Sequence, residues 1–341
     1  MITKLQAEVF MKLSHLLPVL DVRSPSEFIQ GHIPGAFNLP LFTDEERAKV
    51  GIRFKNSGRD FAVKLGLQIV GPKLSWFAEE AQRLAPARKV LVHCWRGGMR
   101  SESIAWLLRM SGFEVQLLDG GYKAYRRYIR GQIALPVKLI VLGGLTGSGK
   151  SDVLKHLAIL GQQVLDLETL ANHKGSVFGG LGQPDQPTTE QFENNIFPVW
   201  EKFDLSKTIW VEDESRAIGS VNIPEILFHA MMKSPIAVME VSLEIRVERL
   251  VKEYAGMPEE GLADALMRIK DSLGGPAIRD ALEALGKGEF LIMARLALVH
   301  YDRLYSKSLA RRNAGVAYRL PIIVDDPERT ANTLIQLNNG E

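Results

Sequence analysis

The sequence has little cysteine, little net charge and no long apolar run. Its 341 residues include one cysteine, Cys94, so no disulfide can form within the chain. The 42 basic and 40 acidic residues leave a formal net charge of +2, so the overall charge gives no reason to expect a nucleic-acid partner, although a local basic surface could still bind phosphates. No stretch of about 18 unbroken apolar residues occurs, so we expect no membrane-spanning helix. The N-terminus has no basic head and apolar middle of a secretory signal, and we expect a cytoplasmic protein.

Length and hydrophobic content predict two globular domains. With 46% hydrophobic and 24% charged residues, the chain is long enough to bury two cores. Short apolar runs alternate with helical patterns on both sides of Pro136, which is typical of α/β domains with parallel sheets. We therefore expect α/β domains over 1–133 and 134–341, the second with a helical C-terminal part over 244–312 and a loop over 173–190. The apolar runs predict strands at 16–23, 89–93, 114–118, 137–142, 163–167, 208–212, 236–241 and 322–324.

A glycine-rich segment between an expected strand and an expected helix has the pattern of a phosphate-binding P-loop. Residues 144–151 match Gly-x-x-x-x-Gly-Lys-Ser/Thr. Its glycines let successive backbone N–H groups face phosphate oxygens, and the helix that follows adds the positive end of its dipole. Lys150 would add a point charge, and the Ser151 hydroxyl could hold Mg²⁺. The predicted phosphate contacts are Gly144, Thr146, Gly147, Ser148, Gly149, Lys150 and Ser151.

Charged residues that could complete the phosphate site follow two later strands. Residues 212–216 end an apolar strand, at the sheet edge where α/β folds bind ligands. We assign Glu212, Asp213, Glu214 and Arg216 to a Walker-B-like position, in which Asp213 would join Ser151 if Mg²⁺ is bound and Glu212 or Asp213 could act as a base. The alternative is that some of these acids cap the next helix or pair with Arg216.

Two arginines lie three residues apart on one expected helical face. Arg246 and Arg249 could clamp phosphates from that face. The alternative is surface pairing with Glu248 and Glu253, which are close in sequence.

The single cysteine lies in a segment built like an anion site. Cys94 follows an apolar strand and precedes two glycines and a helix expected from Ser101. The loop amides, the helix N-terminus, Arg96 and Arg100 would together favour the thiolate over the thiol, which makes a cysteine reactive. An inert core cysteine needs none of these groups. His93 should point to the opposite face of the strand, so we expect it to be packed rather than to act as a base.

Segments on both sides of the cysteine loop resemble the signature of rhodanese domains. They run from Leu20 to Pro40 and from Asp119 to Tyr122. The resemblance implies that Cys94 carries a transferable sulfur or selenium as a persulfide or selenylsulfide. Arg100, however, follows Cys94 by six residues, the spacing of cysteine phosphatases rather than the five of common sulfurtransferases. A phosphatase or arsenate-reducing enzyme, with Cys94 as nucleophile and Arg100 stabilising the transition state, therefore stays open.

The fusion of a rhodanese-like domain to a P-loop domain resembles the bacterial tRNA 2-selenouridine synthase family. The resemblance implies a transferase acting on the wobble 2-thiouridine of tRNAs for lysine, glutamate and glutamine. Geranyl diphosphate would first alkylate the sulfur, and selenium from selenophosphate would then displace the geranyl thiol. It also implies a monomer without a tightly bound cofactor, and an enzyme that supplies selenophosphate as a partner. The matching segments are 94–98, 120–124, 143–151, 166–168, 173–176, 212–216 and 244–246.

Other readings of the two domains remain. The cysteine domain could be a silent sensor that regulates a P-loop kinase. Residues 122–130 interleave basic and aromatic side chains, as RNA-binding segments do, although a solvated helix face over packed tyrosines has the same pattern. Within that segment Lys123, Arg126 and Arg127 are the candidate tRNA contacts, and Arg311 with Arg312 forms a second basic spot. The aromatics that could line a geranyl groove, or simply a core, are Phe178, Phe192, Phe197 and Trp200.

Overall fold

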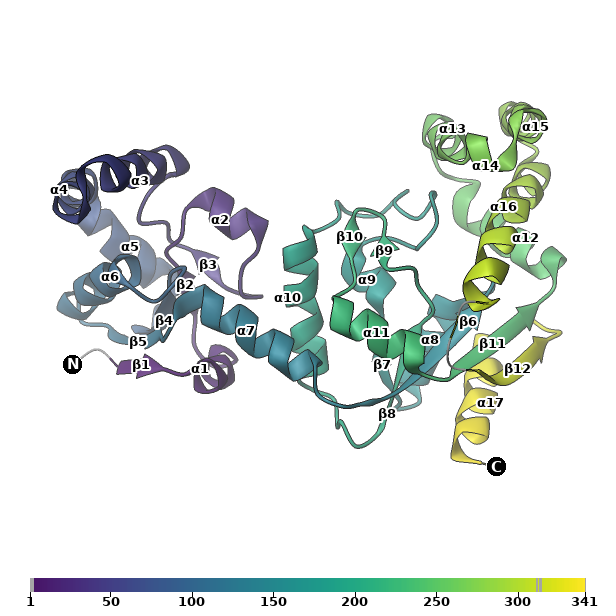
Figure 1. The fold of residues 1–341 in the computed structure, drawn as a ribbon, viewed down its shortest axis with the longest axis horizontal. Helices are drawn as coiled ribbons and strands as arrows, with labels where there is room; N and C mark the ends of the chain where they lie inside the picture. The colour runs from purple at the N-terminus through teal and green to yellow at the C-terminus, as the bar shows by residue number, and fades with distance from the viewer. Residues whose placement is uncertain (1–2, 311, 313–314, 341) are drawn as a thin grey trace. The chain divides into compact units, whose positions relative to one another are not determined.

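The computed structural model describes residues 3–310, 312 and 315–340. The chain divides into two compact units, Met1–Ile133 and Ala134–Glu341. Each unit is an α/β structure built on its own parallel sheet (Figure 1). In the part of the chain that is described, no helix combines the length and the apolar character needed to cross a membrane.

The first unit contains a sheet of five strands in the order β1-β5-β4-β2-β3, with every neighbouring pair parallel. Parallel neighbours require crossover connections, which the helices provide. The strands are β1 (Thr3–Leu5), β2 (Val19–Asp21), β3 (Phe37–Asn38), β4 (Lys89–His93) and β5 (Glu114–Leu118). The helices are α1 (Ala7–Ser14), α2 (Pro25–Gln30), α3 (Asp44–Ser57), α4 (Arg59–Val70), the short 3₁₀ helix Gly71–Lys73, α5 (Leu74–Leu84), α6 (Met99–Met110) and α7 (Gly121–Ile133).

Local sequence explains where the helices of the first unit begin. Ser24 and Glu27 form a reciprocal capping box at the start of α2, where Pro25 occupies the first helical position. Thr43 and Glu46 do the same for α3. One core of this unit packs Leu20, Val92 and neighbouring strand residues against Phe77 of α5 and Leu108 of α6. These contacts hold the C-terminal edge of β4, and the loop that follows it, in a fixed place.

The second unit contains another five-stranded parallel sheet, in the order β12-β11-β6-β8-β7. A small antiparallel pair, β9 (Ala217–Ile218) and β10 (Val221–Asn222), lies outside it. The main strands are β6 (Lys138–Gly144), β7 (Gln163–Leu165), β8 (Thr208–Glu212), β11 (Ile236–Val241) and β12 (Val316–Ile322). The helices are α8 (Lys150–Ile159), α9 (Leu167–Ala171), α10 (Thr189–Trp200), α11 (Glu225–Lys233), α12 (Leu243–Tyr254), α13 (Glu259–Arg268), α14 (Lys270–Leu273), α15 (Gly275–Gly286), α16 (Phe290–Ala310) and α17 (Pro327–Asn339).

The second unit has a sheet core and a separate helical core. Leu142, Trp210 and Met239 of the sheet pack with Leu154 of α8 and Leu334 of α17. Helices α13, α15 and α16 form a layer of their own, whose buried side chains also enclose parts of the segment between α9 and α10. That segment, residues 172–188, contains only turns, bends and irregular backbone, as expected for a loop over a site.

Most of the expected strands are present, and the differences lie at element ends and edges. The strands at 89–93, 114–118, 208–212 and 236–241 are confirmed with their expected bounds. The strand expected at 322–324 instead runs from Val316 to Ile322, because its pairing with β11 sets its length. The short edge strand β1 and the β9–β10 pair are not signalled by an apolar run in the sequence.

Candidate functional site

Cys94 is held in a tight loop between β4 and α6. Only 3% of its surface is accessible, and the Ser101 hydroxyl of α6 donates a hydrogen bond to its sulfur at 3.2 Å. The start of α7 closes the loop from the other side, since Tyr122 N–H donates to the Cys94 carbonyl at 2.8 Å. A Cβ on Gly121, whose φ is +61°, would approach the Cys94 oxygen to 2.4 Å. Only glycine fits this close crossing of the two backbones.

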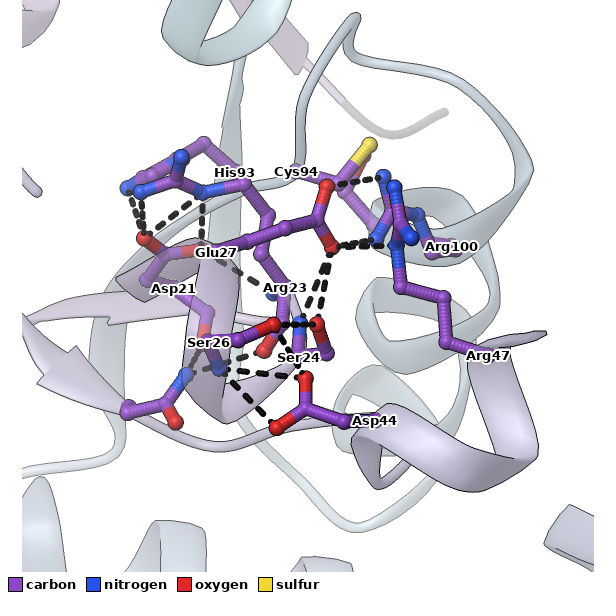
Figure 2. Close-up of polar contacts among 12 residues, drawn as sticks. Asp21, Arg23, Ser24, Ser26, Glu27, Asp44, Arg47, His93, Cys94 and Arg100 are labelled. Carbon is purple, nitrogen blue, oxygen red and sulfur yellow. Dashed lines mark hydrogen bonds and ion pairs between the residues drawn. The ribbon is translucent and has the colours of Figure 1, made fainter. Parts of the chain in front are cut away.

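Arg100 reaches a carboxylate of α2. Its Nη1 lies 2.7 Å from Glu27 Oε2, and Arg47 of α3 contacts the same oxygen at 2.8 Å (Figure 2). Partial burial would raise the pKa of Glu27, but the hydrogen bond and charge of Arg100, aided by Arg47, hold it below its usual range. Arg100 therefore already has an anionic partner, which differs from the role of transition-state arginine expected for a phosphatase. Arg96, in contrast, is exposed on the loop.

His93 is a packed residue, as expected. Its side chain is fully buried against the rings of Phe10 and Tyr122. Burial lowers its pKa, although Asp21, 3.7 Å away, acts in the opposite direction. The Asp21 carboxylate pairs with the buried Arg23 at 2.6 Å (Figure 2). This polar cluster braces β2 and β4 beneath the cysteine loop.

The P-loop of the second unit opens into a cavity of about 780 Å³. This volume is in the range of small-molecule binding sites. All seven predicted phosphate contacts line it, with glycines at positions 147 and 149 in the left-handed region. Lys150 Nζ lies 3.1 Å from the Gly144 carbonyl, and the Gly144 N–H donates to the Tyr305 hydroxyl at 2.8 Å. The cavity is also lined by Asp152, Lys155, Glu168, Lys174, Ser176, Asp213, Glu214, Arg249, Leu250, Tyr254, Tyr301, Leu304 and Tyr305.

The four residues of the Walker-B-like run occupy different environments. Glu212 is buried, accepts the Glu168 N–H at 2.6 Å, and leaves its other oxygen without a hydrogen-bond partner in the described part of the chain. Glu214 lines the cavity, where burial and the nearby Glu168 raise its pKa well above the usual range. Arg216 is exposed and does not line the cavity. Of the four residues, Asp213 and Glu214 line the cavity, whereas Glu212 and Arg216 do not.

The two residues proposed for Mg²⁺, Ser151 and Asp213, contact other side chains of the protein. Ser151 donates its hydroxyl proton to Glu168 at 2.7 Å, and Asp213 forms an ion pair with Arg312 at 2.6 Å. Both side chains therefore have protein partners, and Mg²⁺ binding by them stays a prediction. Over the described residues, no group of three or more His, Cys, Asp or Glu side chains is placed to hold a metal ion.

Arg246 and Arg249 differ from the expected pair of phosphate clamps. Arg246 is 3% exposed, forms a bidentate pair with Asp302 at 2.8 and 2.9 Å, and reaches the P-loop carbonyl of Thr146. It braces the loop backbone and does not line the cavity. Arg249 does line it and packs against Gly149, but its charge is shared with Asp152 and Asp325. In the described part of the chain, the ion pairs of both arginines are with aspartates that lie far away in the sequence, and not with Glu248 or Glu253.

The candidate tRNA contacts are only partly on the surface. Lys123 and Arg127 are exposed on α7, whereas Arg126 is 8% exposed. Little of the Arg126 side chain is accessible in this structure, so Lys123 and Arg127 are better placed for a tRNA contact than Arg126. Arg312 is buried with Asp213, which corrects its assignment to a basic spot, and Arg311 lies outside the described residues.

The aromatic residues suggested for a geranyl groove are core residues. Phe192, Phe197 and Trp200 of α10 are at most 2% exposed, and Phe178 packs on Tyr254 in the helical core. None of the four lines the cavity. The apolar surface of the cavity comes instead from Leu250, Leu304 and the rings of Tyr254, Tyr301 and Tyr305. Helix α16 supplies Tyr301, Leu304 and Tyr305 from about 150 positions beyond the P-loop, and no sequence pattern pointed to these three residues.

Comparison with known proteins identifies both units. The family profile of the tRNA 2-selenouridine synthase AAA domain matches residues 137–320, and that of the rhodanese-like domain matches residues 4–128. The chain belongs to the tRNA 2-selenouridine synthase family. The proteins so named from Sulfurovum sp. and Bdellovibrio bacteriovorus are each 35% identical to it, over 89% of this chain and 91% and 92% of theirs. The one from Nitrosomonas europaea is 32% identical, over 89% of this chain and 91% of its own.

The buried Glu212 should make the free energy of unfolding of the second unit depend on pH. Burial, with repulsion from Asp166 and Glu168, raises the pKa of Glu212 well above the usual range. The folded unit keeps this proton at a pH where the unfolded chain has lost it. The contribution of Glu212 to the free energy of unfolding is therefore largest below the ordinary carboxyl pKa of about 4.3. It is lost as the pH rises toward the pKa that Glu212 has in the folded protein.

Glu212→Gln removes this titration and keeps an acceptor for the Glu168 N–H. We expect it to raise the free energy of unfolding of the second unit at pH 8 by on the order of 1 kcal/mol, with little change at pH 4. Calorimetry at both pH values measures this. The matched control is Glu248→Gln, an exposed glutamate on α12, which should change neither value. A gain that is equal at both pH values would contradict the assignment.

Proposed function

We propose that this protein is a tRNA-modifying enzyme that converts 2-thiouridine at the wobble position to 2-selenouridine. The observation that carries the proposal is the family match, which spans a unit with a reactive-type cysteine loop and a unit with an open phosphate cavity. Two separate anion sites suit a reaction with two different phosphate-containing substrates. The name of the relatives, tRNA 2-selenouridine synthase, supports the conversion of 2-thiouridine to 2-selenouridine. The two sites support a reaction in two steps, one in each unit.

The second unit would perform the first step, S-geranylation. The sulfur of 2-thiouridine attacks C1 of geranyl diphosphate, a C–S bond forms, diphosphate leaves, and the base loses its N3 proton. Lys150 and the P-loop amides are placed to hold the diphosphate and the charge that develops as it leaves. Leu250, Leu304 and the tyrosine rings offer apolar surface for the geranyl carbons in the same cavity.

The first unit would perform the second step, selenium transfer. Cys94 would take selenium from selenophosphate: an S–Se bond forms, the P–Se bond breaks, and phosphite leaves. The terminal selenium then attacks C2 of the base, a C–Se bond forms, the C–S bond breaks, and geranylthiol leaves with a proton. A small thiol reductant finally attacks the Cys94 sulfur, so the S–Se bond breaks, selenium stays on the base, and Cys94 is left in a mixed disulfide that a second thiol reduces. Arg96 and the loop amides favour a charged atom at the end of Cys94, and the exposed Lys123 and Arg127 offer contacts to tRNA phosphates.

Nucleoside mass spectrometry tests the proposal directly. Thiolated tRNAs for lysine, glutamate and glutamine are incubated with the protein, geranyl diphosphate and selenophosphate, and each substrate is omitted in turn. We expect 2-selenouridine only in the complete reaction and S-geranyl-2-thiouridine when selenophosphate is absent. Unchanged 2-thiouridine in every reaction with folded protein would reject the proposed function. The family match across both units favours this reaction over a phosphatase, whose arginine would have to leave Glu27.

A further inference from the structure

Trp95 is a large aromatic side chain that the cysteine loop leaves partly exposed. It follows Cys94 directly, and 36% of its surface is accessible against 3% for Cys94. Single exposed apolar side chains are common on protein surfaces, so exposure alone assigns no role. The support beneath this ring and the charges around it are more informative.

The inner side of Trp95 is held by two fully buried side chains. Its ring lies 5.7 Å from that of Tyr122, tilted by 40°, and the Arg23 guanidinium lies 5.8 Å from its centroid. Arg23 is fixed in turn by its ion pair with Asp21. The tryptophan is therefore oriented before any ligand arrives, and binding on its exposed side would lose little side-chain entropy.

Exposed cations lie close to Trp95 along the backbone. Arg96 is the next residue, and the backbone N–H of Lys123 donates to the Trp95 carbonyl at 3.0 Å, which ties the start of α7 to the loop. Arg127 follows one helical turn later on the same exposed face. A supported aromatic face beside a short row of cations fits a single-stranded nucleic acid, in which bases stack on aromatic rings and phosphates contact the cations.

We propose that Trp95 stacks on an unpaired base of the tRNA anticodon loop and so places the wobble nucleotide beside Cys94. The inference rests on the proposed function, since it takes tRNA as the substrate. It names a feature of that substrate, an unstacked base in a single-stranded loop, because a paired base in an RNA helix presents no free face. Trp95 is then a binding residue that positions the base, and Cys94 remains the residue that transfers selenium.

Trp95→Ala tests the inference, with Trp106→Ala as the matched control. Trp106 is 59% exposed and lies on α6, two turns beyond the cysteine loop. The measurements are the Kd for a thiolated anticodon stem-loop RNA, and KM and kcat for selenium transfer to geranylated tRNA. We expect Trp95→Ala to raise Kd and KM by about tenfold, the effect of losing one base–aromatic stack, with a smaller change in kcat. Trp95→Phe should restore most of the affinity, and Trp106→Ala should match the unchanged protein.

Two further outcomes separate this inference from the proposed function. If the unchanged protein forms 2-selenouridine and Trp95→Ala keeps its KM and Kd, the stacking role is wrong and the function stands. If the unchanged protein does not modify tRNA, the function itself fails. Trp95→Leu keeps an apolar side chain and guards against misfolding of the alanine variant, so normal RNA affinity in Trp95→Leu, or equal losses in the variants of Trp95 and Trp106, would also overturn the stacking role.

Discussion

Cys94→Ser is expected to abolish 2-selenouridine formation while S-geranyl-2-thiouridine still accumulates. The hydroxyl is a much poorer nucleophile than a thiolate and cannot carry selenium, so we expect the rate of selenium transfer to fall by at least about a thousandfold. Because the cysteine is 3% exposed and serine is nearly the same size, the fold should be retained. Mass spectrometry of nucleosides from tRNA treated with both substrates measures the two products together.

Ser101→Ala is the matched control for this prediction. Ser101 donates a hydrogen bond to the Cys94 sulfur but has no part in carrying selenium. Loss of one such bond should slow selenium transfer by no more than about tenfold. If Cys94→Ser kept a normal rate of selenation, the carrier role of the cysteine would have to be abandoned.

Lys150→Ala is expected to give the opposite pattern, with geranylation reduced about a hundredfold and selenium transfer retained. The lysine is the cation of the P-loop, and removing one charged donor from a leaving phosphate group has an effect of this size. Transfer of selenium should therefore proceed normally when the tRNA is supplied already geranylated. The measurement is the initial rate of each half-reaction with purified variant protein.

Lys155→Ala is the control, because Lys155 also lines the cavity but is 64% exposed and lies outside the P-loop motif. Its geranylation rate should stay within about twofold of the unchanged protein, since exposed ion pairs contribute little. Equal losses in both lysine variants would point to a general electrostatic effect of the cavity. Unchanged geranylation in Lys150→Ala would remove the P-loop from the reaction.

Local patterns predicted much of the fold. The strand 89–93 is a buried apolar run next to a glycine-containing loop, and Ser24 with Glu27 marks the start of α2 through contacts within one turn. Strand ends were less predictable, because β12 is defined by pairing with β11 and not by its own apolar residues. The edge strand β1 has the same origin, since it exists through its register with β5.

The candidate sites divide in the same way. The P-loop residues singled out in the sequence line the cavity, and their contacts to phosphate stay a prediction. The aromatics of α10 were considered for a groove, although helical periodicity equally fits a core, and they are buried. Arg126 could likewise be either exposed or buried on the sequence pattern alone. In the structure, one turn of α7 exposes Lys123 and Arg127 and buries Arg126.

The sequence by itself determined the cysteine loop and the P-loop, because each is a contiguous segment whose glycines, helix start and charged side chains act over a few residues. Only the tertiary structure decided which charges are already paired. Arg100 meets Glu27 across 73 residues of chain, and Arg312 meets Asp213 across 99. Such pairs form where the topology of the parallel sheets brings distant loops together, and no local pattern records that proximity.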